Sequence, residues 1–292
     1  MSTPLVSIGL PIFNSKEKIA RVIKSLLNQD YKNIEIIVTD NSNNLDSFLI
    51  VKKIFRSKKI KYFKNKKNFG SIINHNKSLS KSNGKYFMWI HDVDIISKNY
   101  ISSCVHILEQ DQAKVAVMGK IIYTKNHKTE CEYREPNFNE DSTFLRLKKF
   151  LLSDYPDTLL CALFRKRNGK YLKKIISPEL IFILNLIIKG KVCGTSKTKF
   201  IKGNDSNRTI EQIKKNYEGD NQFFKNSLFK RYGRYLYVFK EIFNSNCNFF
   251  KKLLLYLIYI QYHFPIIRFF FKKKNIYYFK KNKSDIDISI NI

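Results

Sequence analysis

Over about its first 120 residues, the chain alternates short apolar runs with longer segments in which apolar residues recur every three or four positions. Apolar runs at 5–10, 34–39, 60–63, 86–90 and 115–117 have the length of buried β-strands. Segments 15–29, 45–56, 71–79 and 97–109 have helical periodicity, with Ile19, Ile23 and Leu26 on one face of the first. Strands alternating with such helices predict a mostly parallel sheet flanked by helices.

Polar turns follow four of these strands, at Pro11–Ser15, Asp40–Asn44, Asn65–Gly70 and His91–Asp94. Right-handed crossovers bring the carboxyl ends of parallel strands to one edge, where open α/β sheets bind ligands, so we expect these turns to form one pocket. In the last turn, Asp92 and Asp94 flank a single residue. Paired acids at this edge suit a divalent cation that also holds substrate phosphates, although an isolated Asp-x-Asp is also common in solvated loops.

The second half of the chain follows a different pattern. Residues 142–152 read as a helix, 159–164 as a strand, and Ser177-Pro178-Glu179 as the start of an apolar helix through Ile188. From about residue 223 the chain is aromatic and basic, and its uninterrupted apolar run, Leu253–Ile260, is too short to span a bilayer. We therefore expect an α/β domain at 1–215 and a helical basic, aromatic extension at 216–292. That extension either lies on an anionic membrane surface or packs on the domain.

Charge and cysteine content narrow the class of protein. The 292 residues include 54 Lys+Arg against 24 Asp+Glu, a net charge of +30, which favours a polyanionic partner such as an anionic membrane or a phosphorylated substrate. We expect no nucleic-acid partner, because the early strands are almost wholly apolar instead of presenting basic and aromatic residues on an exposed face. The five cysteines lack metal or redox spacing and the N-terminus lacks a signal-peptide pattern, so we expect a cytoplasmic protein.

The motifs, taken in order, resemble glycosyltransferase family 2, inverting enzymes with a Rossmann-like GT-A fold that use nucleotide-sugar donors. Residues 6–14 resemble the opening strand and Pro-x-Tyr-Asn turn, 25–29 the Ser-Leu-x-x-Gln helix end, and 35–42 the Glu-Ile-Ile-Val-x-Asp-x-Ser strand and turn. Asn68-x-Gly70, Asn74 and Gly84-x-Tyr86 then lead into the Asp-x-Asp. The resemblance covers residues 5–100, thins after about 125 and is absent from the tail.

This resemblance implies a nucleotide-sugar site, with a UDP-sugar as the favoured donor. By this resemblance, Pro11, Phe13 and Asn14 line the base and ribose, and Asp40 accepts a hydrogen bond from the base, beside Asn41. Asn68 and Asn74 are implied to lie near the ribose and diphosphate. Asp92 is implied to contact the ribose or sugar, and Asp94 to bind Mn²⁺ or Mg²⁺ on the diphosphate. Many members have further acids where this chain has Asn41 and Ile95, so its pocket carries less negative charge.

A catalytic base is implied at the start of a later helix. Glu179 resembles that position, with Asp154 and Asp157 as alternatives, although an acid in a first turn also favours the helix dipole without catalysis. We expect a glycosyltransferase that moves a sugar onto a hydroxyl of a glycan or lipid-linked acceptor in cell-surface polysaccharide synthesis, at the inner face of the cell membrane. The alternative is a catalytically inactive GT-A scaffold, for which Asn41 and Ile95 are the argument.

Overall fold

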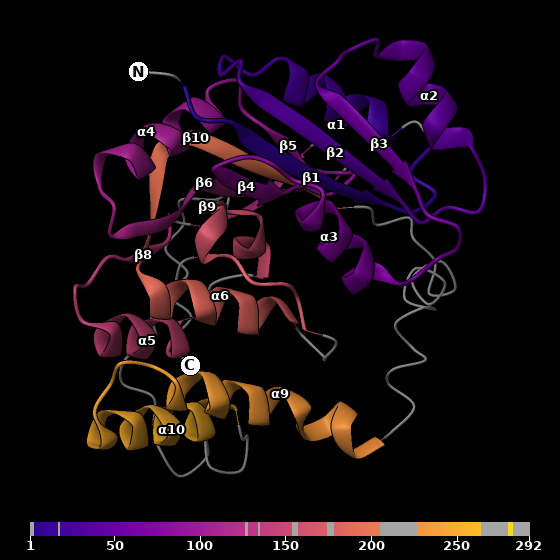
Figure 1. Ribbon diagram of the computed structural model, residues 1–292. Coiled ribbons are helices and arrows are strands. Elements are labelled where there is room, and N and C mark those ends of the chain that lie inside the picture. The colour runs from indigo at the N-terminus through magenta and orange to yellow at the C-terminus, as the bar shows by residue number, and fades with distance from the viewer. Residues whose placement is uncertain are drawn as a thin grey trace.

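The computed structural model describes residues 3–16, 18–125, 128–133, 135–153, 157–173, 178–204, 227–263 and 280–282 (Figure 1). The strands are β1 (Val6–Ile12), β2 (Ile34–Asp40), β3 (Ile60–Lys64), β4 (Tyr86–Trp89), β5 (Ile95–Ile96), β6 (Lys114–Lys125), β7 (Lys128–Tyr133), β8 (Asn137–Phe138), β9 (Leu163–Arg165), β10 (Lys191–Asn204) and β11 (Lys280–Asn282). The α-helices are α1 (Lys18–Leu27), α2 (Asp46–Ile54), α3 (Ser71–Ser80), α4 (Tyr100–Gln110), α5 (Thr143–Leu151), α6 (Pro178–Lys189), α9 (Ser227–Phe243) and α10 (Phe249–His263). Short 3-10 helices span Asp157–Cys161 and Lys166–Asn168.

These strands form one sheet whose main path runs β11-β7-β6-β9-β4-β1-β2-β3. The neighbours β4, β1, β2 and β3 are parallel, and β9 is antiparallel to both β4 and β6. Every residue of β1 and β2 is buried, which is why these strands read as continuous apolar runs in the sequence. The predicted mostly parallel α/β fold is confirmed, and the carboxyl ends of β1–β4 lie at one edge.

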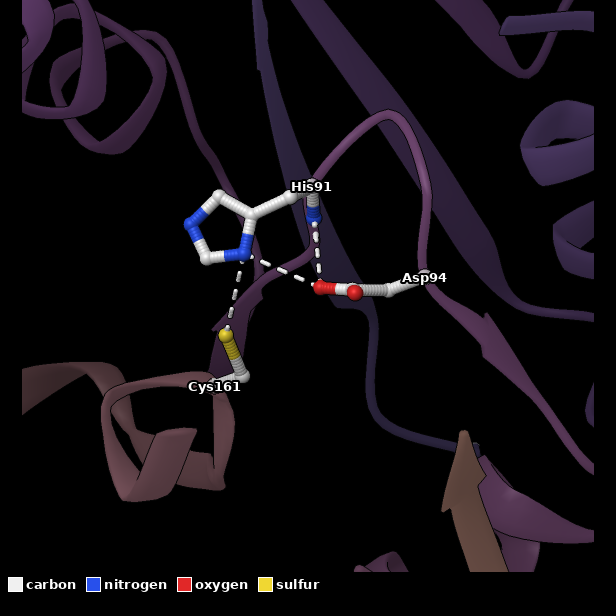
Figure 2. A group of neighbouring side chains, drawn as sticks. All are labelled: His91, Asp94 and Cys161. Atoms are coloured by element: carbon white, nitrogen blue, oxygen red, sulfur yellow. Dashed lines mark hydrogen bonds and ion pairs between the residues drawn. The ribbon is translucent and has the colours of Figure 1, made fainter. Parts of the chain in front are cut away.

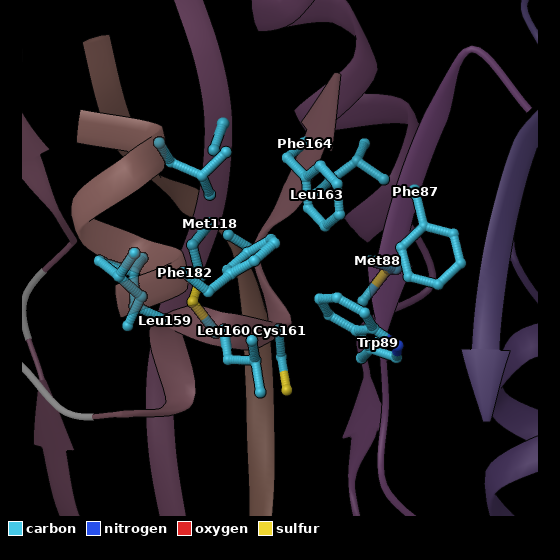
Figure 3. Close-up of a cluster of buried hydrophobic side chains, with 14 of the residues drawn as sticks. Phe87, Met88, Trp89, Met118, Leu159, Leu160, Cys161, Leu163, Phe164 and Phe182 are labelled. Carbon is cyan, nitrogen blue, oxygen red and sulfur yellow. The ribbon is translucent and has the colours of Figure 1, made fainter. Parts of the chain in front are cut away.

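An aromatic cluster joins the strand that precedes the Asp-x-Asp to a later helix (Figure 3). The ring of Trp89, at the end of β4, lies 5.0 Å from that of Phe87 and 5.1 Å from that of Phe182 on α6. Phe164 on β9 contacts the rings of both Trp89 and Phe182. Aromatic rings at these separations pack favourably beyond the area they bury. The cluster therefore fixes the start of α6, which carries Glu179, relative to the end of β4.

The middle of the chain differs from the sequence-based prediction. Residues 159–164 are not one strand, because the 3-10 helix extends to Cys161 and β9 begins only at Leu163. The 14-residue strand β10, which pairs in parallel with β6, was not predicted. A register shift between Thr195 and Lys199 interrupts its pairing, and this irregularity breaks the alternation by which a strand is recognised.

Two of the predicted helical segments, 15–29 and 97–109, form helices that begin three residues later, and the serines at their predicted starts have other partners. Helix α1 begins at Lys18, and the hydroxyl of Ser15 donates instead to the carboxylate of Asp92. Helix α4 begins at Tyr100, and the hydroxyl of Ser97 bonds to Thr198 on β10. Both hydroxyls thus tie loops of the first half to distant segments instead of capping a helix.

Helices α9 and α10 form a hairpin that packs on α5 and α6, on the side away from the parallel strands (Figure 1). Its inner side contributes buried side chains to the core: Val238, Ile242, Leu255, Ile258 and Tyr259. The predicted domain boundary at residues 215/216 lies outside the described residues. Within the described part of the chain, no helix combines the length and the apolar character needed to cross a membrane.

Candidate active site

The turns that follow β1, β2 and β4 are joined by hydrogen bonds. The backbone N–H of Asn14 donates to Ser42 Oγ over 2.7 Å, and Ser15 Oγ donates to Asp92 Oδ2 over 2.5 Å. Asn14 has a φ of 51°, in the left-handed region that asparagine tolerates better than most residues, and this bend turns its N–H toward Ser42. Pro11 is buried within β1, and Phe13 is half-buried in the turn beyond it. These three of the four predicted turns therefore converge, as the topology requires.

A network of asparagines fixes this edge of the sheet. Asn74 Nδ2 donates to the carbonyls of Ile12 and Thr39, so it ties the ends of β1 and β2 together. Asn65 Nδ2 donates to the side-chain oxygens of Asn41 and Asn74, over 2.7 and 3.0 Å. Asn65 was not predicted as a site residue; its one signal in the sequence is its position directly after β3.

The contacts of Asn41 require an amide rather than a carboxylate at this position. Its Nδ2 donates to Asn68 Oδ1 and to the carbonyl of Gly70, both over 3.0 Å. A carboxylate has no hydrogen to donate to these two oxygens and would face both of them as a like charge. Asn41 and Asn68 are therefore brought together, and their polar atoms hold the Asn65–Gly70 turn against the end of β2.

Asp40 is fully buried, and both of its carboxylate oxygens have donors. Oδ1 accepts from the backbone N–H of Ser42 over 2.8 Å and from that residue's hydroxyl. Oδ2 accepts from Tyr62 Oη over 2.8 Å and from Lys64 Nζ over 2.9 Å. Burial, together with the charge of Asp40, raises the pKa of Tyr62, so its hydroxyl stays a donor. A nucleotide base that bonds Asp40 must replace one of these donors, and the Lys64 side chain is 30% exposed.

The second acid of the Asp-x-Asp is enclosed by β10. Asp94 is fully buried; its Oδ1 accepts from the backbone N–H of Gly203 over 3.2 Å, and its Oδ2 lies 3.7 Å from Lys202 Nζ. Burial would raise the pKa of Asp94, but Lys202 and His91 lower it more. The pKa of Lys202 is raised, because attraction to Asp94 outweighs the effect of its burial. Lys202 and Gly203 were not predicted as site residues, because the strand that carries them, β10, was not predicted.

The partners of His91 define its protonation (Figure 2). His75 Nδ1 faces the carbonyl of Ser71 over 2.9 Å and must donate, so its Nε2 accepts from His91 Nε2, 3.3 Å away. His91 Nδ1 faces Asp94 Oδ2 over 2.9 Å and must donate as well. Burial and Lys202 lower the pKa of His91, but Cys161 and Asp94 raise it further, to about 10. His91 is therefore a cation, whereas burial lowers the pKa of His75 to about 3 and keeps it neutral.

The expected metal ion meets an unfavourable environment at Asp94. Ligand atoms of His91, Asp94 and Cys161 lie within 4.8 Å of one another, but a thiol and an imidazole suit softer ions than Mg²⁺. A divalent ion 4 Å from an ammonium is repelled by on the order of 8 kcal/mol at an effective dielectric constant of 20. The protonated His91 and Lys202 already neutralise this carboxylate, so these residues do not fit Mn²⁺ or Mg²⁺. The expectation of such an ion stays a prediction.

Glu179 lies in the first turn of α6. Burial raises the pKa of its carboxyl group and the nearby charge of Asp157 adds to this effect, while His91 and Lys202 act in the opposite direction. Glu179 therefore lies within electrostatic reach of the residues that enclose Asp94. Asp157 begins the 3-10 helix and is exposed. The third candidate base, Asp154, lies outside the described residues.

Comparison with known proteins agrees with this fold. A glucosyltransferase of Campylobacter jejuni, named for a GalNAc(5)-diNAcBac-PP-undecaprenol acceptor, is 26% identical over 189 residues, which are 63% of this chain and 60% of that protein. An Escherichia coli β-1,3-glucosyltransferase, named for UDP-Glc and a GlcNAc-diphosphoundecaprenol acceptor, is 33% identical over 37% of this chain and 43% of its own length. The chain thus spans less than two thirds of these relatives.

Solved structures show the same fold at low sequence identity. The crystal structure of S. aureus TarS 1-349 in complex with UDP-GlcNAc matches with a TM-score of 0.62 and 15% identity, over 90% of this chain and 74% of that one. Residues 7–170, more than half of the chain, match the family described as Glycosyl transferase family 2. Together with the order of the motifs and the sheet they form, this match shows that the chain belongs to glycosyl transferase family 2.

Proposed function

We propose that this chain transfers a sugar, with inversion, from a UDP-sugar to a hydroxyl group of a lipid-linked saccharide that is built into a cell-surface polysaccharide. The observation that carries the proposal is that Glu179, in the first turn of α6, is within electrostatic range of His91 and Lys202, which enclose Asp94. This supports Glu179 as a carboxylate that accepts a proton near the edge where open α/β sheets bind nucleotides. The UDP-GlcNAc complex of the structural neighbour and the acceptors named for the two relatives support the choice of substrates.

The reaction needs one proton acceptor and one region of positive charge. The acceptor oxygen forms a bond to the anomeric carbon while the bond from that carbon to the diphosphate oxygen breaks, and its electron pair leaves with UDP. Glu179 takes the proton of the acceptor hydroxyl, a contribution of roughly 10²- to 10⁴-fold for a positioned base. Asp92, held by Ser15, is proposed to orient the ribose or the donor sugar. Pro11, Phe13 and Asn14 line the base and ribose, with Asp40 bonding the base.

We propose that the α9–α10 hairpin lies on the anionic inner face of the cell membrane, where a lipid-linked acceptor is found. Seven large apolar side chains of the hairpin are at least 44% exposed: Leu236, Phe243, Phe249, Phe250, Leu253, Leu254 and Leu257. Lys240 and Lys251 lie exposed among them. Apolar side chains flanked by lysines suit the boundary between acyl chains and anionic headgroups.

The reaction is tested by UDP release from a panel of UDP-sugars, with and without a polyprenyl-diphosphate-linked saccharide as acceptor. We expect acceptor-dependent release from one donor, loss of that release in Glu179→Gln, and near-normal release in Asp157→Asn, which removes the exposed alternative base. Loss of release in Asp157→Asn alone would move the base to that residue. An absence of release together with an absence of UDP binding would favour the inactive scaffold.

Membrane contact is tested by co-sedimentation with vesicles. We expect the protein to bind vesicles of phosphatidylglycerol more tightly than vesicles of phosphatidylcholine, and Phe249→Ser/Phe250→Ser to weaken this binding. The control is Leu45→Ser/Leu49→Ser, which removes two exposed apolar side chains at the start of α2, away from the hairpin. Equal binding by both double variants would contradict the proposed surface.

A further inference from the structure

Lys202 is a cation at the candidate active site whose N–H groups have few hydrogen-bond acceptors among the described residues. Its Nζ lies 3.7 Å from Asp94 Oδ2, beyond hydrogen-bond length, and 3.3 Å from His91 Nδ1. That nitrogen already donates to Asp94 and therefore cannot accept from Lys202. Within the stretches that the structure describes, the ammonium has no other hydrogen-bond acceptor. Three N–H groups at this position are thus available to an anionic ligand.

The strand around Lys202 holds it in this place. Gly203 follows directly, and its N–H donates to Asp94 Oδ1. A Cβ at Gly203 would clash with the carbonyl oxygen of Val93, so only glycine lets β10 approach the Asp-x-Asp this closely. The side chain of Lys202 is nevertheless 24% exposed, whereas that of Asp94 is fully buried. The carboxylate anchors the lysine from inside, and the lysine is the part of the pair that a ligand can reach.

We propose that Lys202 is the cation that this site offers to the diphosphate of the donor, in the place where a divalent metal ion was expected. This inference rests on the proposed function, since it takes the diphosphate to lie at the Asp-x-Asp edge. When the bond from the anomeric carbon to the diphosphate oxygen breaks, its electron pair stays on the diphosphate. The Lys202 ammonium meets that added negative charge, and Asp94 keeps the ammonium in position. Donor binding and transfer then proceed without added metal.

The test measures binding of UDP by calorimetry, in EDTA and then with Mn²⁺, for the wild type and three variants. Lys202→Met removes the charge while keeping an unbranched side chain. Lys202→Arg keeps the charge. Lys199→Met is the matched control, because it removes an exposed lysine from the same strand. Melting temperatures show whether each variant is folded, and electron paramagnetic resonance of Mn²⁺ reports metal binding independently of activity.

We expect the wild type, Lys199→Met and Lys202→Arg to bind UDP in EDTA, and Lys202→Met to bind it 10- to 100-fold more weakly, as for a lost charge-assisted hydrogen bond. Wild-type binding that requires Mn²⁺ would overturn the role of Lys202 and leave the proposed function standing. Equal binding by Lys202→Met and Lys199→Met in EDTA would overturn it as well. Absence of wild-type UDP binding under both conditions would overturn this inference together with the proposed donor.

Discussion

The buried carboxylate of Glu35 connects several strands of the parallel sheet, and we expect its charge to stabilise the fold. Glu35 lies at the start of β2, at the edge opposite the candidate active site, and its side chain is 6% exposed. Its Oε1 accepts from Ser7 Oγ on β1 over 2.5 Å and from the backbone N–H of Asn83 over 2.6 Å. Its Oε2 accepts from Lys61 Nζ on β3 over 2.7 Å. One carboxylate therefore connects β1, β2, β3 and the turn before β4.

Glu35→Gln keeps the shape of the side chain and removes its charge. In the variant, the amide oxygen still accepts from Ser7 and Asn83, but these two hydrogen bonds no longer involve a charged acceptor, which costs about 1 to 1.5 kcal/mol. The bond to Lys61 is lost; because that lysine is 43% exposed, it contributes only about 0.5 to 1 kcal/mol. We expect a total loss of about 2 kcal/mol in the free energy of unfolding at pH 7, measured by urea denaturation.

The pH dependence of this difference is fixed by the direction of the pKa shift. Burial would raise the pKa of Glu35, but Lys61, Ser7 and Asn83 lower it below 4.5. The stabilisation is therefore complete above pH 4.5 and is lost as pH falls through the lower pKa of the folded protein. The gap between wild type and Glu35→Gln should shrink along that path. A gap near zero at pH 7, or one that does not change on acidification, would refute this reasoning.

Three further predictions concern the site. Glu179→Gln should lower kcat by about 10²- to 10⁴-fold at an unchanged donor KM. It should also remove the rise of kcat with pH, whose midpoint in the wild type lies above 4.5 because burial and Asp157 raise the pKa of Glu179. A variant that keeps this rise would exclude Glu179 as the base. Ser15→Ala removes a donor to Asp92 and should weaken UDP binding about tenfold without altering the circular dichroism spectrum. Gly203→Ala should weaken UDP binding in a protein that still folds, because a Cβ there forces β10 away from Val93; unchanged titrations would show that this close approach is not needed.

The parallel half of the fold was predictable because β1, β2 and β4 are buried on both faces and its helices on one. Continuous apolar runs mark the strands and a three- to four-residue apolar repeat marks the helices, so the sequence predicts that strands and helices alternate through β4. That alternation in turn predicts the edge of the sheet where the turns meet. Asp40, Asn41, Asp92 and Asp94 could be placed at that edge from topology alone. The sequence could not show that Asp40 is already bonded by Tyr62 and Lys64, since those contacts depend on the register of β3 against β2.

The second half was predicted less well for a different reason. Strand β10 has Lys197, Lys199 and Lys202 in a stretch with a register shift, so neither its apolar alternation nor its length is visible in the sequence. Lys202 reaches Asp94 across more than 100 residues, and only the pairing of β10 with β5 and β6 brings the two together. Contacts between strands so distant in the chain carry no local signal.

The aromatic cluster has a spectroscopic consequence. Trp89 is the only tryptophan in the chain, and it is fully buried directly before the turn that holds Asp92 and Asp94. Its indole N–H donates to Ser78 Oγ over 3.0 Å, and its ring lies 6.1 Å from that of His75, which in turn contacts His91. All tryptophan emission of this protein therefore originates beneath the candidate site. Its intensity and wavelength provide a label-free optical signal for ligand binding at the candidate site.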